Sequence, residues 1–306
     1  MKPGRKLRIP GVVAALWLSC HFAIAQENEI PFQLEDNLIR VPVVINRSKV
    51  DAVLDSGTGS FGLDRDFASS LGLHPGAESG KIPGGGAAIP MYPVQLAQIE
   101  FGPEHLTQVA GIAFDMGSLS SSAGFPVKAL LGLPVFLPQP ISIDYPDRKI
   151  MFLPAGKEMA CADPIPFSIA GGTPIVSVTL KATPASAART LHLIVDLGTR
   201  HYAAMLGGPF LDSAEGKLLE QGGKPTQVGT GTGGPVMGSI VVVSNLTVGG
   251  HDFPALEIAL TRQVGAFSSG IADGTLGVPL WKAGTIAFDY SHRQICLTLP
   301  KPVTGK

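Results

Sequence analysis

The 306-residue chain contains 45% hydrophobic and 15% charged residues, and its formal net charge at pH 7 is −1. This composition excludes an intrinsically disordered chain. Lys and Arg are scattered along the sequence, so it offers no basic field and we expect no nucleic-acid partner. Gly (38) and Pro (26) are frequent, and short β-branched runs lie between turn residues, which predicts a mostly β fold.

The first 25 residues have the pattern of a secretory signal peptide. Four basic residues before position 9 precede an apolar run, 12–18, and a small-residue cleavage site, 23–25. We therefore expect a mature chain from Gln26 that is exported, either to the periplasm or out of the cell. The apolar run is far shorter than the roughly 20 residues that cross a bilayer, so we expect no membrane span. A lipid anchor on Cys20 is the alternative to cleavage after Ala25.

Removal of this segment leaves Cys161 and Cys296, an even pair in a chain bound for an oxidising compartment. We predict a disulfide between them. Its loop would exceed a hundred residues, which corresponds to about 4–5 kcal/mol in the chain-entropy model. Two buried free thiols are the alternative.

The first half begins with a predicted hairpin, made of strand 38–45, turn 46–48 and strand 49–54, which leads into Asp55–Thr58. A short helix is expected over 64–71, because Asp64 suits its start and Gly72 suits its end. The serine-rich segment 118–122 is interpreted as a polar loop.

The second half repeats this order, with predicted strands 175–180 and 191–195 leading into Asp196–Thr199. Two later features also recur, each at an offset of 145 residues: Leu130–Pro134 matches Thr275–Pro279, and Ile143–Arg148 matches Phe288–Arg293 as the start of a structural hairpin. A duplication at this long period predicts a tandem pair of similar units rather than a solenoid.

We therefore expect two lobes. After the signal peptide, 1–25, the first lobe spans 29–153, a linker rich in small residues spans 154–163, and the second lobe spans 164–300.

Three segments resemble those of a known family, the aspartic peptidases of the pepsin and retropepsin group, especially its exported, two-lobed bacterial members. They are the Asp-Ser-Gly-Thr motif within Val53–Thr58 and the apolar-apolar-Gly segments Leu130–Gly132 and Thr275–Gly277. The resemblance covers nearly the whole mature chain and implies a two-lobed, mostly β peptidase fold. It also implies that Asp55 and Asp196 form a dyad that activates a water to hydrolyse peptide bonds. The residues expected to support this dyad are Ser56, Gly57, Thr58, Gly198 and Thr199.

The chemistry of such a dyad follows from charge. Two carboxylates about 3 Å apart cannot both ionise easily, so they share a proton and one acts as acid while the other acts as base. Hydroxyl hydrogen bonds from Thr58 and Thr199 favour the ionised form, which predicts lowered pKa values and activity shifted to acid pH.

Glycine-rich segments about thirty residues after each aspartate are expected to form flaps over an extended peptide or protein substrate. Their residues are Gly84, Gly85 and Gly86 in the first half, and Gly231 and Gly233 in the second. Ordinary mobile loops are the alternative. The histidines show no metal-binding spacing and there is no Gly-x-Ser-x-Gly motif, so we expect no metal, no cofactor and no serine nucleophile.

One position departs from the family pattern. The residue after each catalytic Asp normally carries a hydroxyl that bonds to the opposite loop; Ser56 keeps this hydroxyl, whereas Leu197 does not. Two alternatives to a peptidase with an Asp55–Asp196 dyad therefore remain: a non-catalytic protein that binds peptide in the cleft, and a peptidase formed by dimerised first halves.

Overall fold

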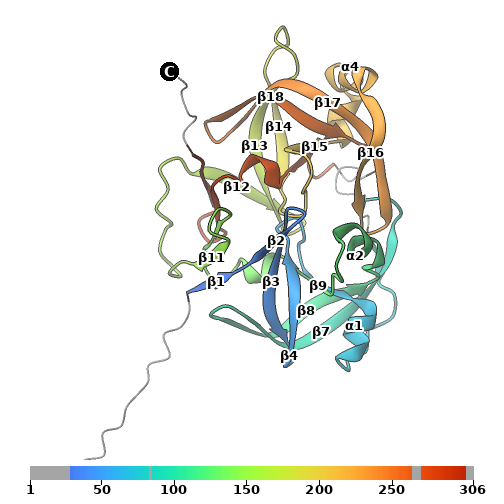
Figure 1. The fold of residues 1–306 in the computed structure, drawn as a ribbon, viewed down its shortest axis with the longest axis vertical. Helices are drawn as coiled ribbons and strands as arrows, with labels where there is room; N and C mark the ends of the chain where they lie inside the picture. The colour runs from blue at the N-terminus through green and yellow to red at the C-terminus, as the bar shows by residue number, and fades with distance from the viewer. Residues whose placement is uncertain (1–27, 83–84, 264–269, 301–306) are drawn as a thin grey trace, which may run out of the picture.

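The computed structural model describes residues 28–82, 85–263 and 270–300. Within these ranges the chain is mostly β and forms two lobes, the first blue to green and the second yellow to red in Figure 1. The predicted fold class is therefore confirmed. The expected signal peptide, including Cys20, and Gly84 of the first expected flap lie outside the described residues.

The first half supplies the following elements. Its strands are β1 (Glu29–Pro31), β2 (Gln33–Glu35), β3 (Leu38–Ile45), β4 (Ser48–Leu54), β5 (Phe61–Asp64), β6 (Gly80–Ile82), β7 (Ile89–Phe101), β8 (Glu104–Phe114), β9 (Ala129–Leu131), β10 (Ile141–Asp144) and β11 (Lys149–Phe152). Its helices are α1 (Arg65–Ser70), α2 (Gly117–Ala123) and the 3-10 turn η1 (Leu133–Val135).

The second half supplies a matching set. Its strands are β12 (Ile165–Ala170), β13 (Thr173–Lys181), β14 (Arg189–Val195), β15 (Ala204–Leu206), β16 (Lys224–Gly231), β17 (Gly234–Val248), β18 (His251–Leu260), β19 (Gly274–Leu276), β20 (Thr285–Asp289) and β21 (Gln294–Thr298). Its helices are α3 (Gly208–Asp212), α4 (Ala214–Gly222) and the 3-10 turn η2 (Val278–Leu280).

The strand order shows the duplication directly. The first half follows β2-β3-β4-β9-β5-β8-β7-β6, and the second follows β12-β13-β14-β19-β15-β18-β17-β16. In each half one extra pairing, β3 with β7 or β13 with β17, folds the sheet back on itself. The parallel pairs also correspond, because β4 lies beside β9 as β14 lies beside β19.

A shared sheet joins the two lobes. Strand β10 of the first half pairs with β20 of the second, and the order continues β1-β11-β10-β20-β21-β12. The two predicted structural hairpins, β10 with β11 and β20 with β21, therefore lie side by side at the lobe interface. The segment between β11 and β12 contains no helix or strand in the described structure.

The local sequence accounts for the first hairpin. Strand β3 alternates along its length, with Ile39, Val41, Val43 and Ile45 buried on one face, as a strand with one face toward a core requires. The predicted helix is confirmed as α1, because the Asp64 side chain accepts a hydrogen bond from the amide of Phe67 at its first turn.

The prediction for residues 118–122 is wrong, because this segment lies in helix α2. Leu119 and Ala123, one turn apart, pack against a hydrophobic cluster of the first half. The Ser120 hydroxyl accepts a hydrogen bond from the amide of Val127, and Gly124 ends the helix at a φ of 79°. Packing of two apolar side chains thus outweighs the weak helix propensity of the serines.

The core runs continuously through both lobes. The Phe136 and Phe288 rings, from opposite halves, have centroids 5.3 Å apart, and Trp281 Nε1 donates a hydrogen bond to Tyr145 Oη at 3.2 Å. These contacts hold the halves together beneath the position where the two Asp-x-Gly-Thr motifs meet.

The predicted disulfide between Cys161 and Cys296 is confirmed. It ties the segment between the lobes to strand β21 of the shared sheet, across a sequence separation of 135 residues. A loop of this length corresponds to about 4–5 kcal/mol in the chain-entropy model.

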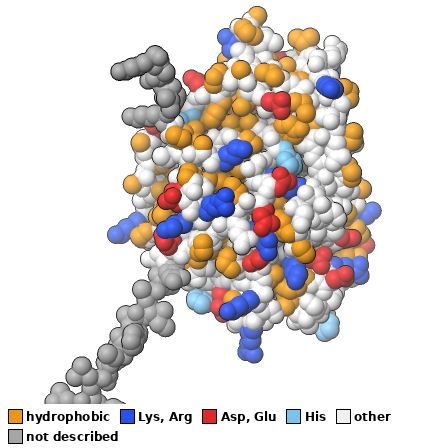
Figure 2. Space-filling view, viewed as in Figure 1, with side chains coloured by type: hydrophobic (Ala, Val, Ile, Leu, Met, Phe, Trp, Pro, Cys, Tyr) orange, Lys and Arg blue, Asp and Glu red, His pale blue; other side chains and the backbone are white. Residues whose placement is uncertain are grey.

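The surface and helices give two further observations. On the face in Figure 2, Lys and Arg side chains lie among Asp and Glu rather than in one patch. None of the helices in the described part of the chain has the length and hydropathy that crossing a bilayer requires.

Candidate active site

The first aspartate turn, Asp55–Thr58, begins where strand β4 ends. The amide of Asp55 donates to Leu131 O at 3.0 Å, and the amide of Leu133 donates to Thr58 O at 2.9 Å. Gly132, between these two leucines, lies so close that a Cβ there would be 2.3 Å from Thr58 O. The apolar-apolar-Gly segment therefore supports the turn, and only glycine fits at its centre.

The second aspartate turn, Asp196–Thr199, is built in the same way at the end of β14. The amide of Asp196 donates to Leu276 O at 3.0 Å, and the amide of Val278 donates to Thr199 O at 2.9 Å. A Cβ on Gly277 would lie 2.5 Å from Thr199 O. The two turns are thus held by equivalent backbone contacts, each from its own half.

The structure brings the carboxyl groups of Asp55 and Asp196 together at the lobe interface, close enough for each to shift the pKa of the other. Each turn also approaches the opposite aspartate. A Cβ on Gly57 would lie 2.4 Å from Asp196 Oδ1, and one on Gly198 would lie 3.2 Å from Asp55 Oδ2. The absence of a side chain at both glycines is what lets the carboxyl groups meet.

Hydrogen-bond donors hold each carboxyl group in place. Asp55 accepts from the Gly57 amide at 2.8 Å and from Thr58 Oγ1 at 3.1 Å. Both donors come from the turn that carries the carboxylate, so the backbone conformation of the turn determines where the carboxylate points.

The second turn uses the same pair of donors. Asp196 accepts from the Gly198 amide at 2.7 Å and from Thr199 Oγ1 at 2.8 Å. Thr199 Oγ1 also lies 2.8 Å from Thr275 Oγ1, a contact that the first half cannot make because Leu130 stands at the equivalent place.

The predicted lowering of the carboxyl pKa values is wrong. Burial and then the charge of Asp196 raise the pKa of Asp55 to about 8, although the hydrogen bonds from Gly57 and Thr58 oppose this rise. Burial also raises the pKa of Asp196, against the hydrogen bonds from Thr199 and Gly198. Loss of water around the pair therefore outweighs the hydrogen bonds, and the pair holds a proton at neutral pH.

Ser56 links the two turns. Its hydroxyl donates to Val195 O at 2.7 Å and accepts from the amide of Leu197 at 3.2 Å. A single hydroxyl from the first half therefore bonds to the second half on both sides of Asp196.

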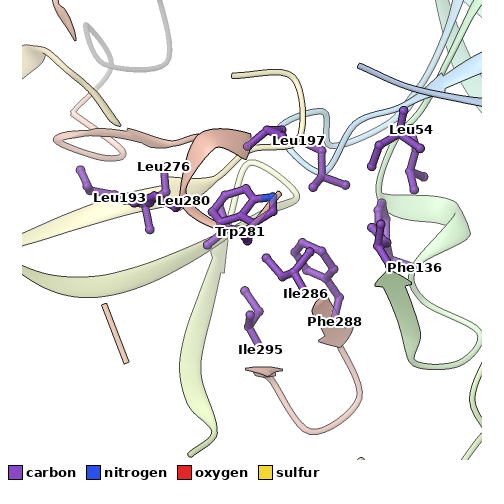
Figure 3. Packing of buried hydrophobic residues seen from close by; sticks show 14 of the residues in the cluster. Leu54, Phe136, Leu193, Leu197, Leu276, Leu280, Trp281, Ile286, Phe288 and Ile295 are labelled. Carbon is purple, nitrogen blue, oxygen red and sulfur yellow. The ribbon is translucent and has the colours of Figure 1, made fainter. Parts of the chain in front are cut away.

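Leu197 has a different role, because its side chain is fully buried in the core that both halves share. Figure 3 shows it with Leu54 and Phe136 of the first half on one side, and with second-half side chains on the other. The second-half side chains labelled there are Leu193, Leu276, Leu280, Trp281, Ile286, Phe288 and Ile295. Position 197 thus contributes packing where the family pattern has a hydrogen bond.

Two glycine-rich hairpins meet above the dyad. The tip between β6 and β7 contacts the tip between β16 and β17: Gly233 donates from its amide to Gly85 O at 3.0 Å, and Ala87 donates to Gly233 O at 3.1 Å. Gly86 pairs with Gly233 as an isolated bridge. A Cβ on Gly231 would lie 2.5 Å from the Cα of Gly85, so the close contact depends on glycine.

A cavity of about 140 Å³ lies between these hairpin tips and the second aspartate turn. Its walls combine apolar side chains, Tyr202, Met205, Val228 and Val236, with Asp196. Three larger hollows, of about 970, 620 and 420 Å³, contain no residue of either aspartate turn in their walls. The smaller cavity therefore borders the dyad through Asp196.

Three polar residues near the second turn were not found by sequence analysis. Asp36, Asn37 and Ser122 of the first half all contact Arg200, which directly follows the second turn. One feature of the sequence could have pointed to this cluster: Arg200 follows the second turn, whereas Gly59 stands at the equivalent place after the first. In the described part of the chain, no group of three or more His, Cys, Asp or Glu side chains is placed to hold a metal ion.

Comparison with known proteins agrees with this geometry. Residues 41–135 match the family model described as Aspartyl protease, so this stretch is similar to an aspartyl protease domain. The match includes the first aspartate turn and ends before Asp196. The comparison with curated proteins gave no match. The assignment of the second half therefore depends on the internal duplication and on the site that the two halves form.

Proposed function

We propose that the protein is an aspartic endopeptidase that hydrolyses peptide bonds with a water activated by Asp55 and Asp196. One observation carries the proposal: two buried carboxyl groups, one from each half, meet beneath a pair of closed hairpins. This arrangement provides an acid, a base and a covered cleft without a covalent intermediate.

The environments of the two carboxyl groups suggest how the roles divide. Burial raises the pKa of both carboxyl groups, so the pair holds one shared proton, and in the proposed mechanism Asp55 is the carboxyl group that carries it. Asp196 then takes a proton from the water as its oxygen attacks the peptide carbonyl carbon, while Asp55 gives its proton to the carbonyl oxygen. When the tetrahedral intermediate collapses, Asp196 transfers its proton to the amide nitrogen, the C–N bond breaks, and Asp55 recovers a proton from the hydroxyl group.

The hairpins suggest the form of the substrate. An extended peptide presents main-chain groups that pair with strand edges, and the facing tips at Gly85 and Gly233 expose backbone rather than side chains. These tips bond to each other in the closed structure, so they must separate when a peptide enters. We therefore propose an extended peptide or protein segment as the substrate.

A non-catalytic peptide-binding protein is the second candidate, favoured by Leu197. Against it, Ser56 still bonds on both sides of Asp196, and both carboxyl groups keep their hydrogen-bond donors. A peptidase made from dimerised first halves has less support, because Asp55 already has a partner carboxyl group within its own chain.

We also propose that the protein acts outside the cytoplasm, in the periplasm or after secretion. The proposal is supported by the disulfide, which persists in oxidising compartments, and by the signal-peptide pattern of residues 1–25.

The test incubates the mature chain, from Gln26, with a peptide library between pH 3 and pH 9. Asp55→Asn and Asp196→Asn keep the shape of each side chain, and Asp163→Asn, an exposed carboxylate between the lobes, is the matched control. The proposal predicts cleavage by the wild type and the control only. Peptide binding without cleavage by the wild-type protein would instead establish the binding candidate.

A further inference from the structure

Arg200 joins the second aspartate turn to the first half. It is buried, with 8% of its side chain exposed, and its Nη1 atom lies 2.7 Å from Asp36 Oδ2. Its Nη2 atom donates to Ser122 Oγ, and its backbone carbonyl accepts from Asn37 Nδ2 at 2.8 Å. The residue directly after the turn is therefore held by three contacts across the lobe interface.

Two of these contacts come from one tight turn between β2 and β3. Asp36 and Asn37 both have positive φ values, 48° and 61°, a conformation that Asp and Asn tolerate better than most side chains. His201 Nε2 lies 3.8 Å from the same carboxylate of Asp36 and is the other basic group that faces it. The turn thus presents an acceptor and a donor together to the segment that follows Thr199.

The first half makes the equivalent contact in another way. Gly59 takes the place of Arg200, and it packs against Gly171 and Gly172 in the turn between β12 and β13. A Cβ on Gly59 would lie 2.1 Å from Gly171 O, and one on Gly172 would lie 2.6 Å from the Cα of Gly59. Each aspartate turn is thus followed by a contact with the opposite half. Bare backbone makes this contact after the first turn, and an ion pair with hydrogen bonds makes it after the second.

The two halves thus differ at Gly59 and Arg200. They also differ at the residues that directly follow the two aspartates. Ser56 gives the second turn its hydrogen bonds, but Leu197 returns no side-chain hydrogen bond to the first half because it carries no hydroxyl. Arg200 lies four residues after Asp196 and lines the same cavity as Asp196, Gly198 and Thr199. Its contacts are therefore well placed to fix the second turn against the first half.

We propose that Arg200 is a positioning residue, which together with Asp36 and Asn37 holds the Asp196 carboxyl group against Asp55 in place of the missing hydroxyl at position 197. The role in catalysis rests on the proposed function, whereas the positioning of the carboxyl group does not. Loss of the Arg200 contacts lets the second turn move away from the first, which lowers kcat while leaving the peptide-binding hairpins in place.

The test compares Arg200→Met and Arg200→Lys with Arg262→Met as matched control. Arg262 also makes two ion pairs in the second half, with Asp212 and Glu220, but it is half exposed and lines no cavity beside the dyad. We expect Arg200→Met to lower kcat about 10- to 100-fold with little change in KM, because small displacements of catalytic groups have effects of this size. Lys should recover part of the loss, and Arg262→Met should match the wild type.

A second measurement tests the position of the carboxyl groups and does not require the protein to cleave a peptide. In protein labelled with ¹³C at the Asp carboxyl groups, NMR titration follows the pKa of Asp55, which the nearby Asp196 charge helps to raise. We expect Arg200→Met to lower this pKa by about one unit or more as the pair separates. An unchanged Asp55 titration in the folded variant overturns the proposal, even if the wild-type protein cleaves no peptide.

Should Arg200→Met fail to fold, Asp36→Asn removes the charge of its partner. Asp36 is 45% exposed, so this change leaves the core intact. The expected effects are the same in direction and smaller in size, and an Asp55 titration identical to wild type again overturns the proposal.

Discussion

The hydroxyl of Ser56 accepts a hydrogen bond from the backbone amide of Leu197 at 3.2 Å, and this contact crosses from one half of the duplicated chain to the other. The same hydroxyl donates to Val195 O. Because Val195 and Leu197 are as buried as Ser56, at 2% and 0% exposed, neither second-half group has water as an alternative partner. The Ser56 side chain therefore helps to fix the second aspartate turn against the first.

Ser56→Ala should destabilise the protein by about 1–3 kcal/mol, because it leaves a buried carbonyl and a buried amide without their partner. Peptidase activity should fall as well, since the second turn loses its link to the first. Urea unfolding measures the stability change. Ser69→Ala, an exposed serine in α1 whose hydroxyl bonds to Arg65 O, is the control and should change stability by less than about 0.5 kcal/mol. Equal unfolding midpoints for the two variants would contradict this role of Ser56.

Leu197→Thr should not restore a more active enzyme, although it recreates the family pattern. Leu197 is fully buried in the shared core, so the change removes packed methyl groups and buries a hydroxyl, at a cost of about 2–4 kcal/mol. We expect a lower melting temperature and activity no higher than wild type. Leu197→Met, which nearly conserves volume, is the control and should cost less than about 1.5 kcal/mol. Higher activity in the Thr variant at unchanged stability would show that position 197 is not a packing site.

The raised pKa of Asp55 predicts how stability depends on pH. Its pKa is about 8 in the folded protein and near the ordinary 3.8 in the unfolded chain, so between these values the folded state binds a proton that the unfolded state has lost. The contribution of Asp55 to stability is therefore full below about pH 4 and is lost as pH rises toward about pH 8. Asp55→Asn removes this loss, and its unfolding free energy relative to wild type should be about 5 kcal/mol higher at pH 8 than at pH 4, because about 1.4 kcal/mol is lost for each of the roughly four pH units between the two pKa values. A difference that is the same at both pH values would contradict the raised pKa.

The raised pKa of Asp55 also sets the upper pH limit of peptidase activity. The proposed mechanism requires one shared proton, so the rate should persist through neutral pH and decline above about pH 8, where that proton is lost. The pH profile of kcat/KM for one cleaved peptide measures this decline at alkaline pH. A rate confined to acid pH would support the original sequence-based prediction instead.

Gly233→Ala should prevent the two hairpin tips from meeting, because a Cβ there would lie 1.6 Å from Ala87 O. We expect KM for peptide substrates to rise on the order of tenfold as the closed state is lost, with stability nearly unchanged. Gly229→Ala is the control in the same hairpin, since a Cβ there comes no closer than 4.0 Å to Met205 Cε. Identical KM values for both variants would mean that the tips do not cover bound substrate.

Much of the fold could be predicted because it is encoded locally and then repeated. The alternation of β3, the Asp64 cap of α1 and the constant offset between Gly132 and Gly277 are properties of short segments. The pairing of β10 with β20 is different, since it joins strands far apart in the chain and no local pattern specifies it.

The candidate site was predicted in its residues but not in its electrostatics. The motif and its repeat identify Asp55 and Asp196, whereas the direction of their pKa shifts depends on how much water the assembled lobes exclude. Arg200 escaped prediction for a related reason. Its partners Asp36 and Ser122 lie far from it in the chain, and an Arg after a turn is ordinary until the fold buries it.

The central claim, that Asp55 and Asp196 act as one catalytic unit, is tested most directly by kcat/KM for a single cleaved peptide in four proteins: wild type, Asp55→Asn, Asp196→Asn and the double variant. Residues that act as a unit have non-additive effects, so each single variant should lose about as much activity as the double variant. Substantial activity in Asp196→Asn, or losses that multiply in the double variant, would contradict a shared dyad.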